Sequence, residues 1–300
     1  METKALKKQL GAAIAMVIVA AIALGAATFA WFVNNTKVTA GDATVSATTA
    51  NTLLIKNESG EWGTTNTFTD SNVNFKPVST IGANSNDSFN FFAQNNWAKD
   101  ASGNITVNKV SSADGSDYWT KDFEIKASQA CKLYLDEDTK FVMGGDNNTT
   151  DKVMRLALVV TNENGDWKAT KFYQINPNEN GTGHYNTTLE SLKADGIKTA
   201  IASSNEGTPV AGNIVSAASK ALTGDNKALA TADPDNGLNA TVGTADELYD
   251  FTQNNEVCKI KAYIWMEGCD YDCNNDTVNE ITGAANTFKA TLGFCAGKSA

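Results

Sequence analysis

The hydrophobic residues of this chain form one long run near its start and many short alternating segments after it. The run covers residues 10–33 and is followed by polar sequence. Three lysines precede it: Lys4, Lys7 and Lys8. A basic start, an apolar core and small residues near its end are typical of an export signal. We therefore expect residues 1–30 to be a signal peptide that is cut between Ala30 and Trp31.

An uncut helix is the alternative, because about 20 apolar residues also suffice to span a bilayer. The run is rich in Ala and Gly, which weakens its tendency to stay in lipid, and no second run of this kind follows Val33. Under both interpretations the rest of the chain is exported, so we expect it to be secreted, extracellular or at the cell surface. The membrane is then a partner only through the N-terminal helix, if that helix stays uncut.

Beyond Val33 the pattern changes to short segments in which apolar and polar residues alternate. Such alternation predicts strands with one buried face. The segments that carry it are residues 37–49, 51–56, 105–110, 118–127, 131–135, 153–161, 167–175, 257–267 and 287–294. Asn164-Gly165 favours a tight hairpin between two of them. Because no amphipathic helices separate the strands, we expect a mainly β fold, an antiparallel β-sandwich or barrel, rather than βαβ units.

Residues 176–245 interrupt this pattern with a long stretch that is rich in Ala, Asn, Thr and Gly and poor in large apolar residues. A stretch of this composition cannot build a core of its own. We interpret it as an insertion into one domain that spans residues 31–300, where it either packs on the surface or stays mobile.

The chain is acidic, with 24 Lys and Arg residues, 34 Asp and Glu residues and a formal charge of −10. Residues 1–30 hold Glu2 and three lysines, so the remaining chain has 21 basic and 33 acidic residues and a charge of −12. Its single arginine is Arg155. The charge argues against a nucleic-acid partner, because neutralising phosphates requires a basic surface.

Five cysteines lie in the exported part: Cys131, Cys258, Cys269, Cys273 and Cys295. All five are disulfide candidates, and their pairing does not follow from the sequence. Cys269 and Cys273 also have a spacing near that of zinc ligands, but no histidine lies close to them. Buried, reduced thiols are the third alternative.

Residues suited to catalysis are scarce. His184 is the only histidine, in a Gly-rich loop, so a Ser-His-Asp or Cys-His mechanism would have to use this position. Asp270 begins a calcium-like loop, but Asn275 takes the glycine position and Ile281 the bidentate glutamate position. The other acids cluster in turns, such as residues 136–138. We therefore expect no enzyme activity, no metal centre and no cofactor.

Two stretches of the sequence, Phe29-Ala30-Trp31-Phe32 with its surroundings and residues 263–273, resemble the TasA/camelysin family of secreted bacterial fibre proteins. Phe29-Ala30-Trp31-Phe32 and its surroundings are similar to the family's signal peptides and mature N-termini. Tyr263-Ile-Trp-Met-Glu-Gly-Cys-Asp-Tyr-Asp-Cys is similar to a motif of TasA-like surface proteins, and together the two matches cover about 35 residues. The resemblance implies a jelly-roll-like sandwich and cleavage by a specialised signal peptidase. It also implies a polymer in which the N-terminal strand of each subunit completes the sheet of the next.

The residues give this fibre hypothesis a physical basis. After cleavage, Trp31, Phe32 and Val33 precede a β-prone segment, and the segment 31–50 is a candidate donor strand. Adding it to the sheet of a second copy pairs its backbone and buries its apolar side chains. Such a head-to-tail contact does not close, so it yields an open homopolymer in a surface or biofilm-matrix fibre. The subunit-interface candidates are Trp31, Phe32, Val33, Val38 and Val45.

Two other functions fit the sequence. A pilin-like subunit would keep its N-terminal hydrophobic helix in the core of a filament, although the chain lacks the acidic fifth residue typical of type IV pilins. A monomeric extracellular module for glycan or host surfaces would use some of the six tryptophans as stacking platforms. A segment that folds back onto its own sandwich is the alternative to a donated strand.

Overall fold

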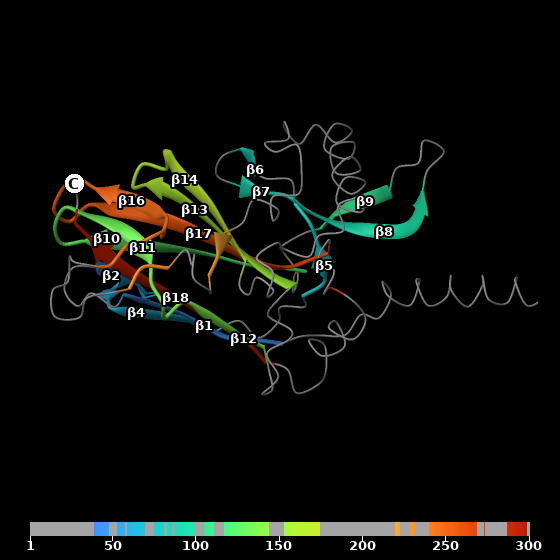
Figure 1. Cartoon of the computed structure of the whole chain (residues 1–300), viewed down its shortest axis with the longest axis horizontal. Helices are drawn as coiled ribbons and strands as arrows, with labels where there is room; N and C mark the ends of the chain where they lie inside the picture. The colour runs from blue at the N-terminus through green and yellow to red at the C-terminus, as the bar shows by residue number, and fades with distance from the viewer. Residues whose placement is uncertain are drawn as a thin grey trace, which may run out of the picture.

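Two large β-sheets make up most of the described part of the chain (Figure 1). The structure is a computed structural model of the whole chain. It describes residues 39–47, 53–57, 59–69, 75–80, 83–85, 88–99, 105–110, 117–143, 153–174, 220–222, 229–231, 240–268, 273 and 287–298. The predicted signal peptide, residues 1–30, and most of the predicted insertion 176–245 therefore lie outside the described residues.

The first sheet, sheet A, has six strands. In spatial order they are β16 (Glu247–Phe251), β11 (Cys131–Leu135), β18 (Thr287–Gly297), β1 (Thr39–Ala47) and β4 (Thr65–Thr69), with β12 (Lys140–Met143) also beside β18. β18 is its longest strand. It pairs with β11 and β12 along one edge and with β1 along the other.

The second sheet, sheet B, has eight strands. Their order is β15 (Lys220–Ala221), β14 (Trp167–Gln174), β13 (Met154–Asn162), β17 (Val257–Glu267), β10 (Trp119–Ala127), β2 (Leu53–Lys56) and β3 (Trp62–Gly63), with β5 (Pro77–Val78) also beside β17. Two small sheets complete the described chain. They pair β6 (Ala83–Ser85) with β7 (Ser88–Phe89), and β8 (Phe91–Lys99) with β9 (Ile105–Val110).

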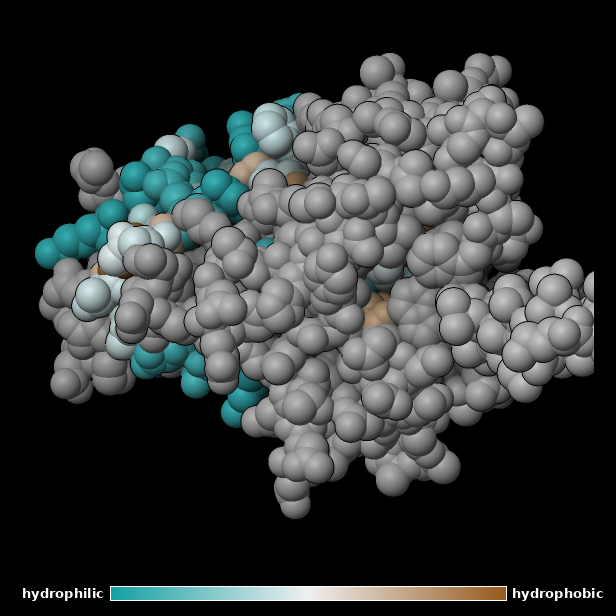
Figure 2. Space-filling view, turned by 45° about the vertical axis from the view of Figure 1, so that its right-hand side comes forward, coloured by the Kyte–Doolittle hydropathy of each residue, from teal (hydrophilic) through white to brown (hydrophobic). Residues whose placement is uncertain are grey.

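Alternating side chains place the core between the two large sheets. In β10, Trp119, Phe123 and Ile125 are buried, whereas Asp122 is exposed. They join one cluster of buried residues with side chains from sheet A, among them Phe294 of β18. Face-to-face sheets with such a shared core form a sandwich-like arrangement. Figure 2 shows mostly hydrophilic colours on the described surface of this view, in keeping with apolar side chains turned inward.

The prediction of a mainly β fold is confirmed, and the sheets are mixed rather than purely antiparallel. β1 pairs with β18 in parallel, as do β14 with β15 and β17 with β5. Parallel neighbours need a long connection, and residues 48–286 separate β1 from β18. Period-two alternation indicates strands but not their partners or directions, so it did not distinguish these pairs.

A second apolar cluster covers the outer face of sheet B near β5. Tyr263 and Trp265 of β17 point to this face, opposite the buried Ile264. The rings of Phe89 and Tyr263 lie 4.8 Å apart, and those of Phe91 and Trp265 lie 5.2 Å apart, both edge to face. The segment that carries β5 to β9 is thus packed onto sheet B through aromatic contacts. Figure 1 places this segment at the end of the sandwich opposite the C-terminus.

Candidate assembly site

The first described strand, β1, lies inside sheet A and has a partner on each side. Ala43 to Ala47 run parallel to residues 290–294 of β18. On the other edge, Asp42 to Ser46 run antiparallel to residues 69–65 of β4. We call the space between β18 and β4 the β1 slot. The strand that fills it therefore forms backbone hydrogen-bond ladders on both edges. Backbone pairing, which does not depend on the identity of the side chains, thus contributes much of the binding in the slot.

Side chains of the slot enclose Val45. This residue is 0% exposed and lies opposite Leu292 of β18 and Asn66 of β4. Two positions on, Ala47 lies opposite Phe294. All except Asn66 belong to the main core cluster. Burial of the Val45 side chain contributes about 1.5–3 kcal/mol to whichever assembly places it there.

Asn66 links the slot to sheet B. Its side chain is 6% exposed, and its Nδ2 donates a hydrogen bond of 3.2 Å to the backbone oxygen of Lys56 in β2. Phe68, two residues on in β4, packs edge to face on Trp119 of β10 at 6.4 Å. β4 is therefore held to sheet B by its own side chains, and not only through β1.

The chain order makes β1 exchangeable. It comes first among the described strands, and residues 48–52 join it to β2 in the opposite sheet. The walls of the slot, β4 and β18, come from later parts of the chain. A β1 strand from a second copy fits the same slot with the same contacts, which is the requirement for domain swapping.

The predicted interface residues fall unevenly on the structure. Val45 is described and lies in the sheet of its own chain, between β18 and β4. The other residues predicted for the interface or the cut lie outside the described residues: Ala30, Trp31, Phe32, Val33 and Val38. The slot residues Asn66 and Phe68 were not predicted, because only the register of the folded sheet brings residues 45 and 66 together.

Four of the five cysteines are described, and each is buried and unbridged: Cys131, Cys258, Cys273 and Cys295. Burial raises the pKa of the Cys131 thiol to about 12, with smaller contributions from Asp250 and Glu256. Burial likewise raises the pKa of Cys295 to about 12, with contributions from Asp136 and Glu137. The thiolate is the reactive form, so these side chains act as small apolar groups in the core. Cys269 lies outside the described residues.

The motif around Trp265 has a structural position. The Trp265 Nε1 atom donates a hydrogen bond of 3.0 Å to Oε2 of Glu267, and both side chains are 0% exposed. The Ser79 Oγ donates to Oε1 of Glu267 at 2.6 Å. Ser79 follows β5, so this buried carboxylate ties the segment of β5 to β9 to sheet B.

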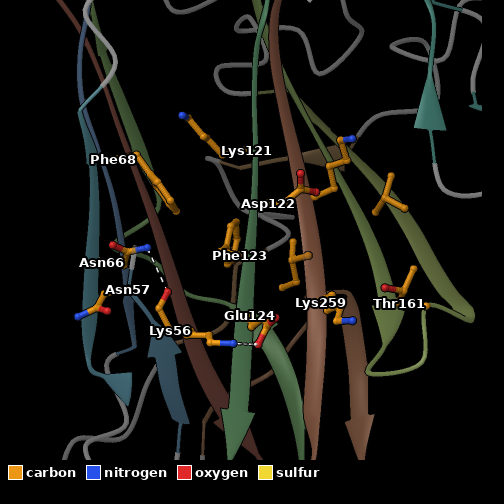
Figure 3. A pocket seen from close by; sticks show the side chains of 14 residues that line it. Lys56, Asn57, Asn66, Phe68, Lys121, Asp122, Phe123, Glu124, Thr161 and Lys259 are labelled. Atoms are coloured by element: carbon orange, nitrogen blue, oxygen red, sulfur yellow. Dashed lines mark hydrogen bonds and ion pairs between the residues drawn. The ribbon is translucent and has the colours of Figure 1, made fainter. Parts of the chain in front are cut away.

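A groove of about 670 Å³ crosses the outer part of sheet B near β4 (Figure 3). Its charges alternate from strand to strand: Lys259 lies opposite Glu124, and Lys261 lies opposite Asp122. The Nζ atom of Lys56 lies 3.0 Å from Oε2 of Glu124. Opposite charges on neighbouring strands stabilise a solvated sheet face. The groove therefore presents a mixed polar surface beside the β1 slot.

Other candidate chemistry lies mostly outside the described residues. His184 and the acidic positions of the loop from Asp270 are not described. In the described part of the chain, no group of three or more His, Cys, Asp and Glu side chains is arranged to hold a metal ion. Among the same residues no helix is long and apolar enough to cross a membrane.

Comparisons with protein-family models, with curated proteins and with solved structures found no match for this chain.

Proposed function

We propose that this protein is a secreted structural subunit that polymerises into extracellular surface or biofilm-matrix filaments by exchange of its N-terminal strand. The observation that carries the proposal is the position of β1, the first of the described strands, which is paired on both edges inside sheet A. In the filament, β1 of one copy occupies the β1 slot of the next. The finer expectations of a jelly-roll-like topology, a leader cut before Trp31 and no catalytic role belong to the same proposal.

Exchange loses no strand contact, because it replaces each contact of β1 by an identical one. Val45 stays buried beside Leu292, and both backbone ladders remain complete. The balance between single chains and polymer then depends on residues 31–38 and on the connection 48–52. Burying Trp31, Phe32 and Val33 against a second copy would add about 1.5–3 kcal/mol each in favour of the polymer.

A pair of engineered cysteines tests whether β1 is exchanged. Thr44 of β1 and Thr67 of β4 are register partners, and neither is buried. In the exported protein with Thr44→Cys and Thr67→Cys, mild oxidation with diamide should link one chain to the next. Electrophoresis without reductant should then show a ladder of covalent multimers.

A matched control pair uses strands that are not exchanged. Lys126 of β10 and Val257 of β17 are register partners within sheet B, and both are half-buried. Lys126→Cys with Val257→Cys should give bonds within single chains only, in the same filaments. If the Thr44 and Thr67 pair also links only within single chains, strand exchange is wrong.

Two further measurements separate the alternatives. N-terminal sequencing of the exported protein should begin at Trp31, whereas an intact apolar helix would support the pilin-like subunit. Negative-stain imaging should show filaments, whereas single particles at high concentration would support a monomeric binding module.

A further inference from the structure

The pairing of β1 with β18 contains one irregularity. Thr39 and Ala40 lie opposite Thr287 and Phe288, whereas Ala43 to Ala47 lie opposite residues 290–294. Between these two stretches, Gly41 and Asp42 together face the single residue Lys289. Two residues against one is the definition of a β-bulge. We call this feature the β1 bulge.

The β1 bulge falls where the pairing with β4 ends. On that edge the register is regular from Ser46 opposite Thr65 to Asp42 opposite Thr69. Thr69 is the last residue of β4. The extra residue of β1 is therefore placed just before the stretch that has partners on both sides, where it interrupts only one of the two ladders.

The side chains of β1 specify this register weakly. The stretch 43–47 reads Ala-Thr-Val-Ser-Ala, in which Val45 is the only large apolar residue. A shift by one residue would turn Val45 to the outer face of the sheet, so burial excludes it. A shift by two residues keeps every side chain on its face, and small residues give little energy against it.

We propose that the β1 bulge fixes the register in which a donated β1 strand is accepted. This inference rests on the proposed function. A shift by two residues in one direction would carry the bulge into the stretch paired with β4, and both ladders would lose hydrogen bonds there. A shift in the other direction would move Asp42 and Ala43 beyond the end of β4. Only one register satisfies both edges of the slot, so all subunits join in the same way.

Deletion of Gly41 isolates the role of the bulge. In the deleted chain Asp42 alone faces Lys289, while Ala40 keeps Phe288 and Thr39 keeps Thr287 as partners. The register of residues 43–47 is unchanged, so every strand contact of the native register is retained. The variant loses only the feature that opposes a shift by two residues.

Cysteine pairs report the register in the filament. The pair Thr44→Cys with Thr67→Cys reports the native register. The pair Thr44→Cys with Thr65→Cys reports the shift by two residues that carries the bulge into the stretch paired with β4, because the native partner of Thr65 is Ser46. In the native register positions 44 and 65 are diagonal neighbours about 7–8 Å apart, which is beyond the reach of an unstrained disulfide.

With the bulge intact, we expect the 44–65 pair to link chains with less than a tenth of the yield of the 44–67 pair. After deletion of Gly41, the two pairs should link chains with yields within threefold of each other. Gly41→Ala is the matched control, because it keeps the number of residues in β1. It should behave like the unaltered protein.

A second variant, Val45→Ala, tests the inference even if the chain without Gly41 does not fold. Val45→Ala removes the only large side chain of the stretch but leaves the bulge in place. If the bulge sets the register, the Val45→Ala filament still links only through the 44–67 pair. Appearance of 44–65 bonds in that filament, or their absence after deletion of Gly41 in folded protein, would overturn the inference. Absence of any bond between chains for the 44–67 pair would instead overturn the proposed function.

Discussion

Ser79 donates a hydrogen bond of 2.6 Å from its Oγ to Oε1 of Glu267, a carboxyl group that is 0% exposed at the end of β17. The residues are 188 positions apart in the sequence. The indole of Trp265 binds the other oxygen of the same carboxyl at 3.0 Å. A buried carboxyl needs such partners, because an unsatisfied one costs several kcal/mol. The contact therefore fixes how the segment from β5 to β9 sits on sheet B.

Ser79→Ala should destabilise the fold by about 1–3 kcal/mol, because it removes the hydroxyl that donates a hydrogen bond to Oε1 of the buried Glu267 carboxyl. The measurement is the free energy of unfolding in urea. Ser59→Ala is the matched control, since Ser59 is exposed and its Oγ donates to Oδ1 of the half-buried Asn57 at 2.7 Å. The control should change stability by less than about 0.5 kcal/mol. Equal stability of the Ser79 variant and the unaltered protein would contradict a structural role for this contact.

Gly293 of β18 is predicted to tolerate no side chain. A Cβ atom there would overlap Oδ1 of Asp136 and lie 2.8 Å from its Cγ. Asp136 is 1% exposed, and its backbone nitrogen donates to the Gly293 oxygen at 3.0 Å, so it has no room to withdraw. Gly293→Ala should destabilise the protein by about 1–3 kcal/mol or more through overpacking.

The control for this substitution is Gly63→Ala in β3. The nearest atom to a Cβ at Gly63 is the backbone oxygen of Thr65 at 3.7 Å, an ordinary van der Waals distance. Thermal unfolding of the two variants should therefore differ clearly, with the lower midpoint for Gly293→Ala. Similar midpoints would show that the turn after β11 moves freely away from β18.

Local sequence patterns predicted much of the sheet but none of its long-range order. The segments 131–135 and 257–267 match β11 and β17 in both bounds, because alternation, followed in β17 by a run of residues buried on both faces, is a local signal. The Asn164-Gly165 hairpin is confirmed as well: Gly165 has a φ of 88°, and the Asn162 nitrogen binds the Asp166 oxygen. Residues that are near in sequence determine such turns.

No local sequence pattern predicted the partners of β1 in the β1 slot. Val45 meets Leu292 and Asn66 because the register of a mixed sheet brings them together, and alternation in each strand is equally compatible with other partners. β8, which extends from Phe91 to Lys99, was not among the predicted strand segments. Its first residues pack on aromatic side chains of β17, a contact that composition alone does not indicate.

Glu256 should make stability depend on pH. Its Oε1 accepts from the Tyr249 hydroxyl at 2.7 Å, and its Oε2 accepts from the Thr252 and Gln253 nitrogens at 2.7 and 3.0 Å. Burial raises the pKa of this carboxyl, but these hydrogen bonds outweigh it and leave the pKa below its ordinary value. A depressed pKa in the folded state stabilises the fold above the unfolded pKa, and this contribution is lost as the pH falls through the folded value.

Glu256→Gln should therefore be less stable than the unaltered protein at pH 7, by about 1–3 kcal/mol for hydrogen bonds to a charged acceptor. The difference should shrink as the pH falls below about 4, where the unfolded carboxyl is protonated. Urea unfolding at several pH values measures it. Glu61→Gln, at an exposed position, is the control and should show no such trend. A difference that stays constant with pH would contradict the charged role of Glu256.

Tyr173 supports the opposite kind of prediction, a substitution that stabilises. Its side chain is 0% exposed in the main core, and among the described residues its hydroxyl has no hydrogen-bond partner. Burial raises its pKa well above the ordinary value, with a smaller contribution from Asp246. Because a buried hydroxyl without a partner costs about 1–3 kcal/mol, Tyr173→Phe should leave stability unchanged or raise it by about 1 kcal/mol.

Tyr249→Phe is the matched comparison, because the Tyr249 hydroxyl donates to Glu256 at 2.7 Å. The same chemical change should destabilise the protein there by about 1.5–3 kcal/mol, the range for hydrogen bonds to charged groups. Urea unfolding of both variants measures the difference. The free energy of unfolding should fall clearly for Tyr249→Phe and should stay the same or rise for Tyr173→Phe. A loss of more than about 1 kcal/mol for Tyr173→Phe would mean that its hydroxyl has a partner in the folded protein, such as a buried water between β14 and sheet A.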